Sequence, residues 1–151
     1  SYYDWRISEM IKGSETSILV KDPSGNTWFM DGAGNISVTA PKDITITAGA
    51  NITMTAGQNI TTSAALNISE SAGVNKATTV GALNTMFVGG DSMMNVMGNL
   101  TETITGDVEY NNEKDRITNS EKGIQSSSND EIVKHSQKET KLNSAEKSKQ
   151  F

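Results

Sequence analysis

The chain has 151 residues, a formal net charge of −5 and no cysteine. Apolar residues make up 34% of it and aromatic residues 5%, which leaves few large side chains for an ordinary globular core. The acidic balance argues against a nucleic-acid partner, and the lack of cysteine excludes disulfides and cysteine-based metal sites. We find no signal peptide and no apolar stretch long enough to cross a bilayer, so export is expected to depend on another machine.

Two turn sequences punctuate the N-terminal part of the chain. Ile18–Val20 and Thr27–Met30 read as strands, and Asp22–Gly25 supplies turn chemistry between them. Asp31–Gly34 then turns the chain a second time. Residues 17–35 are therefore predicted to be a β-hairpin that leads into the following segment.

An eight-residue unit then repeats, beginning DITITAGA, NITMTAGQ, NITTSAAL, NISESAGV from Asp43. Isoleucine recurs at every eighth residue, and glycine occupies a turn position in most units. Because glycine tolerates positive φ, each unit is predicted to be a short strand closed by a tight corner. The corner glycines are Gly49, Gly57, Gly73, Gly81 and Gly89.

Apolar residues alternate with polar ones throughout this repeat. Between Ile36 and Tyr110, 26 of the 38 even-numbered positions are apolar, against 6 of the 37 odd-numbered positions. A period of two is typical of a strand with one buried and one solvated face, and an even repeat length keeps the same face buried. The predicted core row consists of Ile36, Ile44, Ile52, Ile60, Ile68, Val80, Val88, Val96 and Ile104.

Some residues depart from the alternation. Glu70 and Lys76 are even-numbered charges, as are Lys114 and Arg116, and a charge near a core is costly unless it is paired or hydrated. We expect ordered water or anions beside them. Four apolar residues lie at odd positions instead, which indicates either a bulge at Gly89–Gly90 that changes the register or a surface patch that a cargo could grip. These four are Leu83, Phe87, Met93 and Met97.

The composition shifts after Tyr110. From Glu102 onward lie 10 of the 18 acidic and 8 of the 13 basic residues. Three interpretations of residues 111–151 are open: a continued β-repeat with a polar interior, a flexible tail with too little to bury, or a charged helix near Asp130–Lys149. The only histidine, His135, is either a solvated side chain or, in three copies on a threefold axis, a metal ligand, although its odd number is out of phase with the core row.

A stretch of such strands that packs against nothing leaves a thin apolar row in water and its strand edges open. Two arrangements solve this problem. The chain coils on itself as a solenoid, which would be about 22 Å tall at a strand spacing of about 4.8 Å, or three chains wind together into a needle of about 70 Å. The residues alone leave both arrangements open.

Several of these features together resemble the C-terminal needle of the VgrG spike family of type VI secretion systems, which is related to the tail-needle proteins of contractile phages. They are the hydrophobic leading strand, the D-x-x-G-N turn at Asp22–Asn26, the DGAGNIS turn at Asp31–Ser37 and the glycine-punctuated octads, over about residues 17–107. The resemblance implies an all-β homotrimer whose chains intertwine as a triple-stranded β-helix, and it covers residues 111–151 only weakly.

The resemblance also implies a function. It predicts a structural spike at the tip of a contractile injection apparatus, assembled in the bacterial cytoplasm and then secreted into a target cell, where it punctures the membrane and helps deliver effectors. The implied partners are two further copies, the tube, sheath and baseplate, a tip-capping protein, effectors and, transiently, the target membrane, with no nucleic acid. No cofactor is required, and the only bound groups that the resemblance suggests are ions or a metal on the threefold axis.

No catalytic constellation is visible in the sequence. It contains no cysteine–histidine pair, nucleophile elbow, zinc-protease motif or phosphate-binding loop, so we predict that the protein is not an enzyme. Two other functions stay open: a trimeric adhesin-like stalk and a monomeric β-solenoid binding module. The predicted order along the chain is a lead-in segment that packs on something upstream (1–16), the leading hairpin (17–35), the octad β-helix (36–110) and the polar distal segment (111–151).

Overall fold

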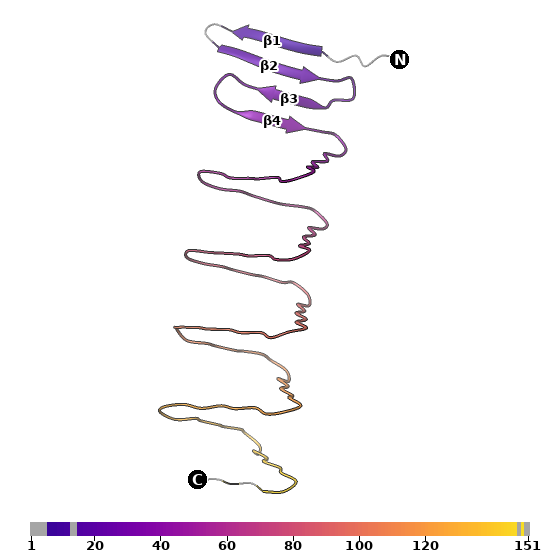
Figure 1. Ribbon diagram of the computed structural model, residues 1–151. Coiled ribbons are helices and arrows are strands. Elements are labelled where there is room, and N and C mark those ends of the chain that lie inside the picture. The colour runs from indigo at the N-terminus through magenta and orange to yellow at the C-terminus, as the bar shows by residue number, and fades with distance from the viewer. Residues whose placement is uncertain (1–5, 13–14, 148, 150–151) are drawn as a thin grey trace. The chain divides into compact units, whose positions relative to one another are not determined.

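The computed structural model describes residues 6–12, 15–147 and 149. Within these residues the protein has four β-strands and no helix (Figure 1). The chain divides into two compact units, Ser1–Thr79 and Val80–Phe151, and the strands belong to the first. Most of the described chain is coil, and the small sheet without helices is consistent with the predicted all-β class. The triple-stranded β-helix is not formed by the chain on its own.

The four strands form one antiparallel sheet in the order β1, β2, β3, β4. The predicted strand Thr27–Met30 coincides with β3, while the strand predicted at Ile18–Val20 is part of a longer β2. The predicted hairpin is the middle of this sheet, because a strand within the predicted lead-in segment pairs with β2 and a fourth strand pairs with β3. The strands are β1 (Arg6–Lys12), β2 (Glu15–Lys21), β3 (Thr27–Met30) and β4 (Ile36–Thr39).

The turns that reverse the chain on either side of β3 share the sequence D-x-x-G-N. In both Asp22–Asn26 and Asp31–Asn35, the aspartate N–H donates to the asparagine carbonyl at 3.2 Å. The carboxylate accepts the N–H groups two and four residues further on and the asparagine side-chain amide. The residue before each asparagine is a glycine, at φ 98° and 99°. In such a turn the aspartate carboxylate accepts its hydrogen bonds from groups of the same turn, and the position with positive φ favours glycine.

These hydrogen bonds favour the ionised carboxylates. The Ser24 hydroxyl, which donates to Asp22 at 2.7 Å, and the Asn26 amide lower the pKa of Asp22 to about 2. The side-chain amide of Asn35, at 2.6 Å, is the main cause of the lowered pKa of Asp31. The carboxylates of Asp22 and Asp31, in the turns on either side of β3, therefore stay ionised at a lower pH than an ordinary aspartate does.

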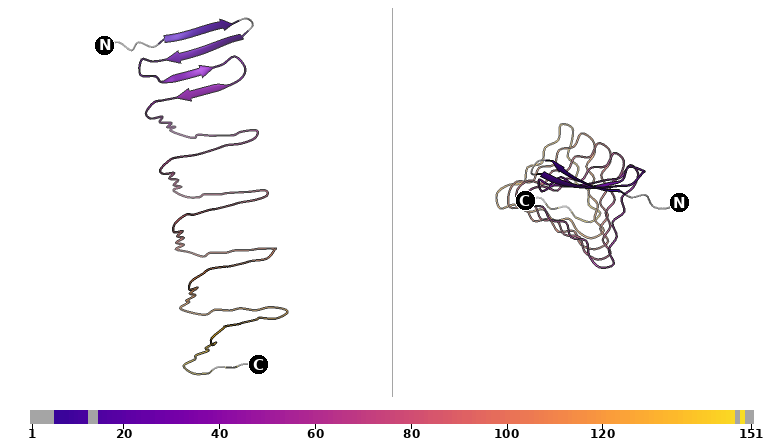
Figure 2. Two further views of the ribbon diagram at one scale, coloured as in Figure 1. Left: turned by 180° about the vertical axis from the view of Figure 1, so that it is seen from behind. Right: turned by 90° about the horizontal axis from the view of Figure 1, so that it is seen from above.

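After β4 the chain is a series of two-residue bends. The first is at Pro41–Lys42, and others begin at every eighth residue as far as Ala145–Glu146. No strand arrow follows β4 in Figure 1 or Figure 2. Outside the sheet, the backbone hydrogen bonds of the described residues lie only in the two D-x-x-G-N turns. Residues 40–147 thus have no backbone partner within the chain, and the parallel ladder that a self-coiled solenoid requires is absent from them.

The corner glycines lie at these bends, but not for the predicted reason. Among the described residues only Gly25, Gly32 and Gly34 have positive φ, so the prediction of positive φ in the octads is wrong. A Cβ built on Gly49 would meet nothing within 4 Å, and the same holds for the other octad glycines. The bends deflect the chain without reversing it, which is why Pro, Ala, Met, Thr and Glu also occupy the first bend position.

In the distal octads, polar side chains bind the bends directly. Ser128 and Ser136 accept the backbone N–H of the residue two positions on through their hydroxyls. The Ser120 hydroxyl donates to the Gly123 carbonyl, and the Asn112 amide donates to a carbonyl two residues on. These four residues are spaced by eight and each precedes a bend, where the earlier octads have Ala, Val or Ile. Local side-chain bonds of this kind are a recognised way to hold a bend without glycine.

The bend spacing decides two further predictions. It continues at eight residues through the segment after Tyr110, as a continued repeat requires, and the charged helix near Asp130–Lys149 is wrong for the described part of that range. It is also unchanged on both sides of Gly89–Gly90, with bends at residues 81–82, 89–90 and 97–98. The register change suggested for Gly89–Gly90 is therefore wrong.

Candidate assembly surface

The sheet presents one apolar face made of even-numbered residues. Val20, Trp28 and Val38 are cross-strand partners, and a second row of partners lies beside them. Side chains alternate between the faces of a strand, so both rows share one face. The face is open: Trp28 and Val38 are each 48% exposed. The second row is Ile18, Met30 and Ile36.

This face continues into the first octad. A groove of about 450 Å³ is lined by residues of all three strands that carry the face and by the start of the repeat, including Val20, Trp28, Val38 and Ile44. Even-numbered apolar residues thus lie on the sheet and again at Ile44, with the even-numbered Lys42 between them, and polar residues such as Asp22 and Asp43 complete the groove. An exposed apolar face of this kind is typical of a surface that another chain covers.

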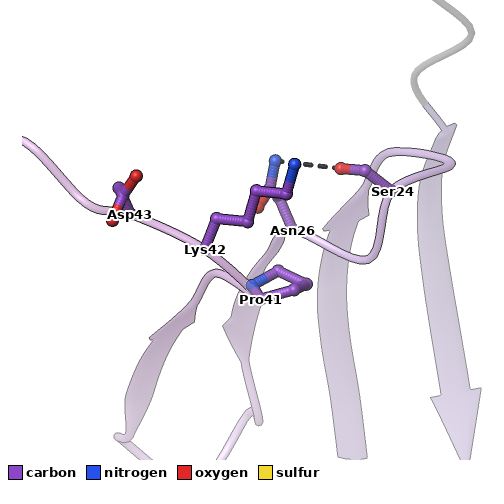
Figure 3. Close-up of a pocket in the computed structure, with 5 residues that line it drawn as sticks. All are labelled: Ser24, Asn26, Pro41, Lys42 and Asp43. Atoms are coloured by element: carbon purple, nitrogen blue, oxygen red, sulfur yellow. Dashed lines mark hydrogen bonds between the residues drawn. The ribbon is translucent and has the colours of Figure 1, made fainter.

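A smaller, polar hollow lies beside the first turn (Figure 3). It is lined by Ser24, Asn26, Pro41, Lys42 and Asp43, and the Asn26 amide donates to the Ser24 hydroxyl at 3.1 Å. A Cβ on Gly25 would lie 3.3 Å from the Pro41 ring, so the turn packs directly against the first bend. The hollow is lined by one positively charged side chain, Lys42, and one carboxylate, Asp43. It lies where the sheet meets the first octad.

The predicted core row is not buried in the chain. Its residues are between 44% exposed, at Val88, and 61% exposed, at Ile36, and none of residues 16–147 is buried. The row that repeats at Ile44, Ile52 and Ile60 has nearly constant exposure, 55% to 57%. A core made of these side chains would need atoms from other chains.

Two side-chain pairs show which way the octads face at their corners. Lys76 Nζ bonds to Glu70 Oε2, and the Arg116 guanidinium lies 4.4 Å from the centre of the Tyr110 ring. In each pair the partners are six residues apart, with a bend in the middle, at residues 73–74 and 113–114. Side chains on either side of a bend can meet only on its concave side. These even-numbered residues therefore lie inside their corners.

The Glu70–Lys76 pair was not foreseen. Both residues were predicted to point inward and to need water or an anion, whereas in the structure they bind each other across Gly73. Hydrogen bonding to Lys76, followed by its charge, lowers the pKa of Glu70. The signal in the sequence was a spacing of six between opposite charges on either side of a corner glycine.

The four odd-numbered apolar residues are strongly exposed. Leu83 is 80%, Phe87 91%, Met93 84% and Met97 103% exposed. Because the bend spacing is regular around them, these side chains keep the odd phase. Their role as a cargo-binding patch stays a prediction.

His135 is exposed and lies just before the bend at residues 137–138. Within the part of the chain that the structure describes, no three His, Cys, Asp or Glu side chains gather as a metal site. A metal at His135 would therefore need copies of the chain, and it stays a prediction.

Comparisons with protein-family models, with curated proteins and with solved structures found no match to the chain. None of the described residues belongs to a helix with the length and apolarity needed to cross a membrane. The candidate surface is thus defined by the residues themselves: an apolar face on the sheet and the concave side of the octads.

Proposed function

We propose that the protein is one chain of a homotrimeric β-helical needle that works mechanically at the tip of a contractile injection apparatus. The observation that carries the proposal is that residues 40–147 make no backbone–backbone hydrogen bond within the described part of the chain. Fixing one residue's backbone costs about 1–2 kcal/mol, and in the lone chain neither backbone–backbone hydrogen bonds nor a buried core offsets that cost. A regular series of bends therefore needs partner chains.

Identical chains are the partners that fit this surface best. The octads have no backbone–backbone hydrogen bonds along their edges, and as far as Tyr110 most of their even-numbered residues are apolar. Copies wound around a common axis would pair those edges and pool those apolar residues. The number three comes from the resemblance to the VgrG needle, not from the chain's own geometry.

The open face of the sheet supports the same assembly. Trp28 and Val38 would be covered if the sheets of three copies faced one another across the axis, ahead of the intertwined octads. A needle of this build leaves no free strand edge along its side, so its chains can unfold only together. Resistance of that kind suits a structure that must survive impact with a cell envelope.

The proposal is tested by the mass and axial ratio of the purified protein in dilute solution. Sedimentation velocity combined with light scattering should give three times the chain mass of 16.2 kDa and a strongly elongated particle. A compact monomer with cooperative melting would contradict it. The puncturing role is tested separately, by the leakage of loaded vesicles when the trimer is driven against them.

A further inference from the structure

The octad repeat poses an alignment problem for any assembly of identical chains. From Ile44 to Ile68 the same position holds isoleucine four times in succession, and from Ala40 to Ala72 the residue before each bend is alanine. If one chain slips by eight residues against its neighbours, the bends still match, and within the run from Ile44 to Ile68 the alternation and the core row match as well. Repetition therefore specifies which face is buried but not which octads lie side by side.

The Glu70–Lys76 pair ends this uniform run. Lys76 takes the position held by isoleucine in the four preceding octads, and Glu70 takes the position held by Ile46, Met54 and Thr62. Lys76 Nζ and Glu70 Oε2 are bonded within one chain, on the concave side of the bend at residues 73–74. The pair is thus the first charged step after four octads with isoleucine at this position, and Asn84 and Ser92 follow Lys76 in the same row.

We propose that the Glu70–Lys76 pair sets the axial register of the assembled chains. The inference rests on the homotrimer proposed above. With three chains aligned, the three pairs meet at one height and form a single neutral polar layer that can share hydrogen bonds and water. When one chain slips by an octad, its pair comes level with Thr62 and Ile68 or with Thr78 and Asn84 of its neighbours, and it loses that shared layer.

The energetic reason is desolvation. In the lone chain both side chains are more than half exposed, at 62% and 63%, so the pair itself contributes little there. Inside an assembly, an ion pair surrounded by apolar atoms is costly to dehydrate. A single polar position in an apolar seam selects register in helical assemblies for the same reason, with some loss of stability.

The test uses the full chain with one spin label at Thr79→Cys, an odd-numbered position in a chain that has no other cysteine. Distances between labels in the trimer are measured by pulsed electron resonance. One variant, Glu70→Thr with Lys76→Ile, extends the preceding octad pattern of Thr62 and Ile68 and removes the polar layer. The matched control, Glu70→Lys with Lys76→Glu, retains the pair in reversed order.

The unsubstituted and charge-reversed chains should each give a single narrow distance, as threefold alignment requires. The apolar variant should still form trimers but lose that single distance, because a slip of one octad moves a label by about 5 Å along the axis. A single unchanged distance in the apolar variant would overturn the register role, and so would its failure to trimerise. A monomeric unsubstituted chain would instead contradict the proposed needle itself.

Discussion

Even-numbered apolar residues line one face of β2, β3 and β4 and continue through the octads to Tyr110, yet only the strands find backbone partners within their own chain. In the sheet, two D-x-x-G-N turns reverse the chain, so each strand returns beside the previous one. In the octads, bends without positive φ deflect the chain, and no segment returns to pair with another. Alternation therefore decides which side is apolar, and the type of turn decides whether the partner is the same chain or another.

The two segments also use glycine differently. Gly32 sits at φ 79°, and a Cβ there would collide with the Thr16 backbone of β2. The octad glycines have ordinary φ values and open space around them in the chain. Gly32 is required because the backbone of β2 lies directly against it in the same chain. The octad glycines have room beside them that a neighbouring chain could fill.

The largest effect should come from a charge on the concave side of an octad. Ile60→Asp would place a carboxylate in the proposed shared core, where an unpaired charge is very costly. We expect loss of the trimer in sedimentation velocity, with the sheet residues retaining their strand signals in NMR. Thr61→Asp, on the odd face of the same octad, is the control and should assemble normally. Equal effects of the two substitutions would contradict the even–odd assignment.

A smaller effect should separate the two kinds of glycine. Gly32→Ala forces a side chain into positive φ and against Thr16, so we expect a loss of about 2 kcal/mol or more in unfolding free energy. Gly49→Ala has neither problem and should change stability by less than about 0.5 kcal/mol. Chemical denaturation measures both. A large loss of unfolding free energy in Gly49→Ala would show that a neighbouring chain approaches that bend closely in the assembly.

The smallest effect should be the acid response of the first turn. The pKa of Asp22 is lowered to about 2, below the value near 3.9 of an unfolded aspartate. The turn's contribution to stability is therefore complete above about pH 4 and is lost as the pH falls through the folded pKa. NMR titration of the Asp22 carboxyl should show this low value, and Ser24→Ala should raise it. An Asp22 pKa near 3.9 in the intact chain would contradict the turn geometry.

Much of the local structure could be predicted from residues alone. The strand at Thr27–Met30 and the eight-residue corners follow from alternation and turn chemistry, which act over a few neighbouring positions. β1 was missed although the pair Gly13-Ser14, a sequence typical of a two-residue hairpin turn, separates its residues from those of β2. The Glu70–Lys76 pair was missed because strand periodicity does not say which side of a bend is concave.

The amino-acid sequence by itself determined the period of eight, the even-numbered apolar side and the two asparagine-closed turns, since each depends on the conformational preferences of a few adjacent residues. The three-dimensional fold adds that β1 to β4 pair with one another within the chain, whereas the described residues after β4 make no backbone–backbone hydrogen bond. A backbone hydrogen bond between strands forms only where the N–H of one segment lies beside the C=O of another. Whether a turn brings them together depends on its full geometry in three dimensions, and no single residue encodes it.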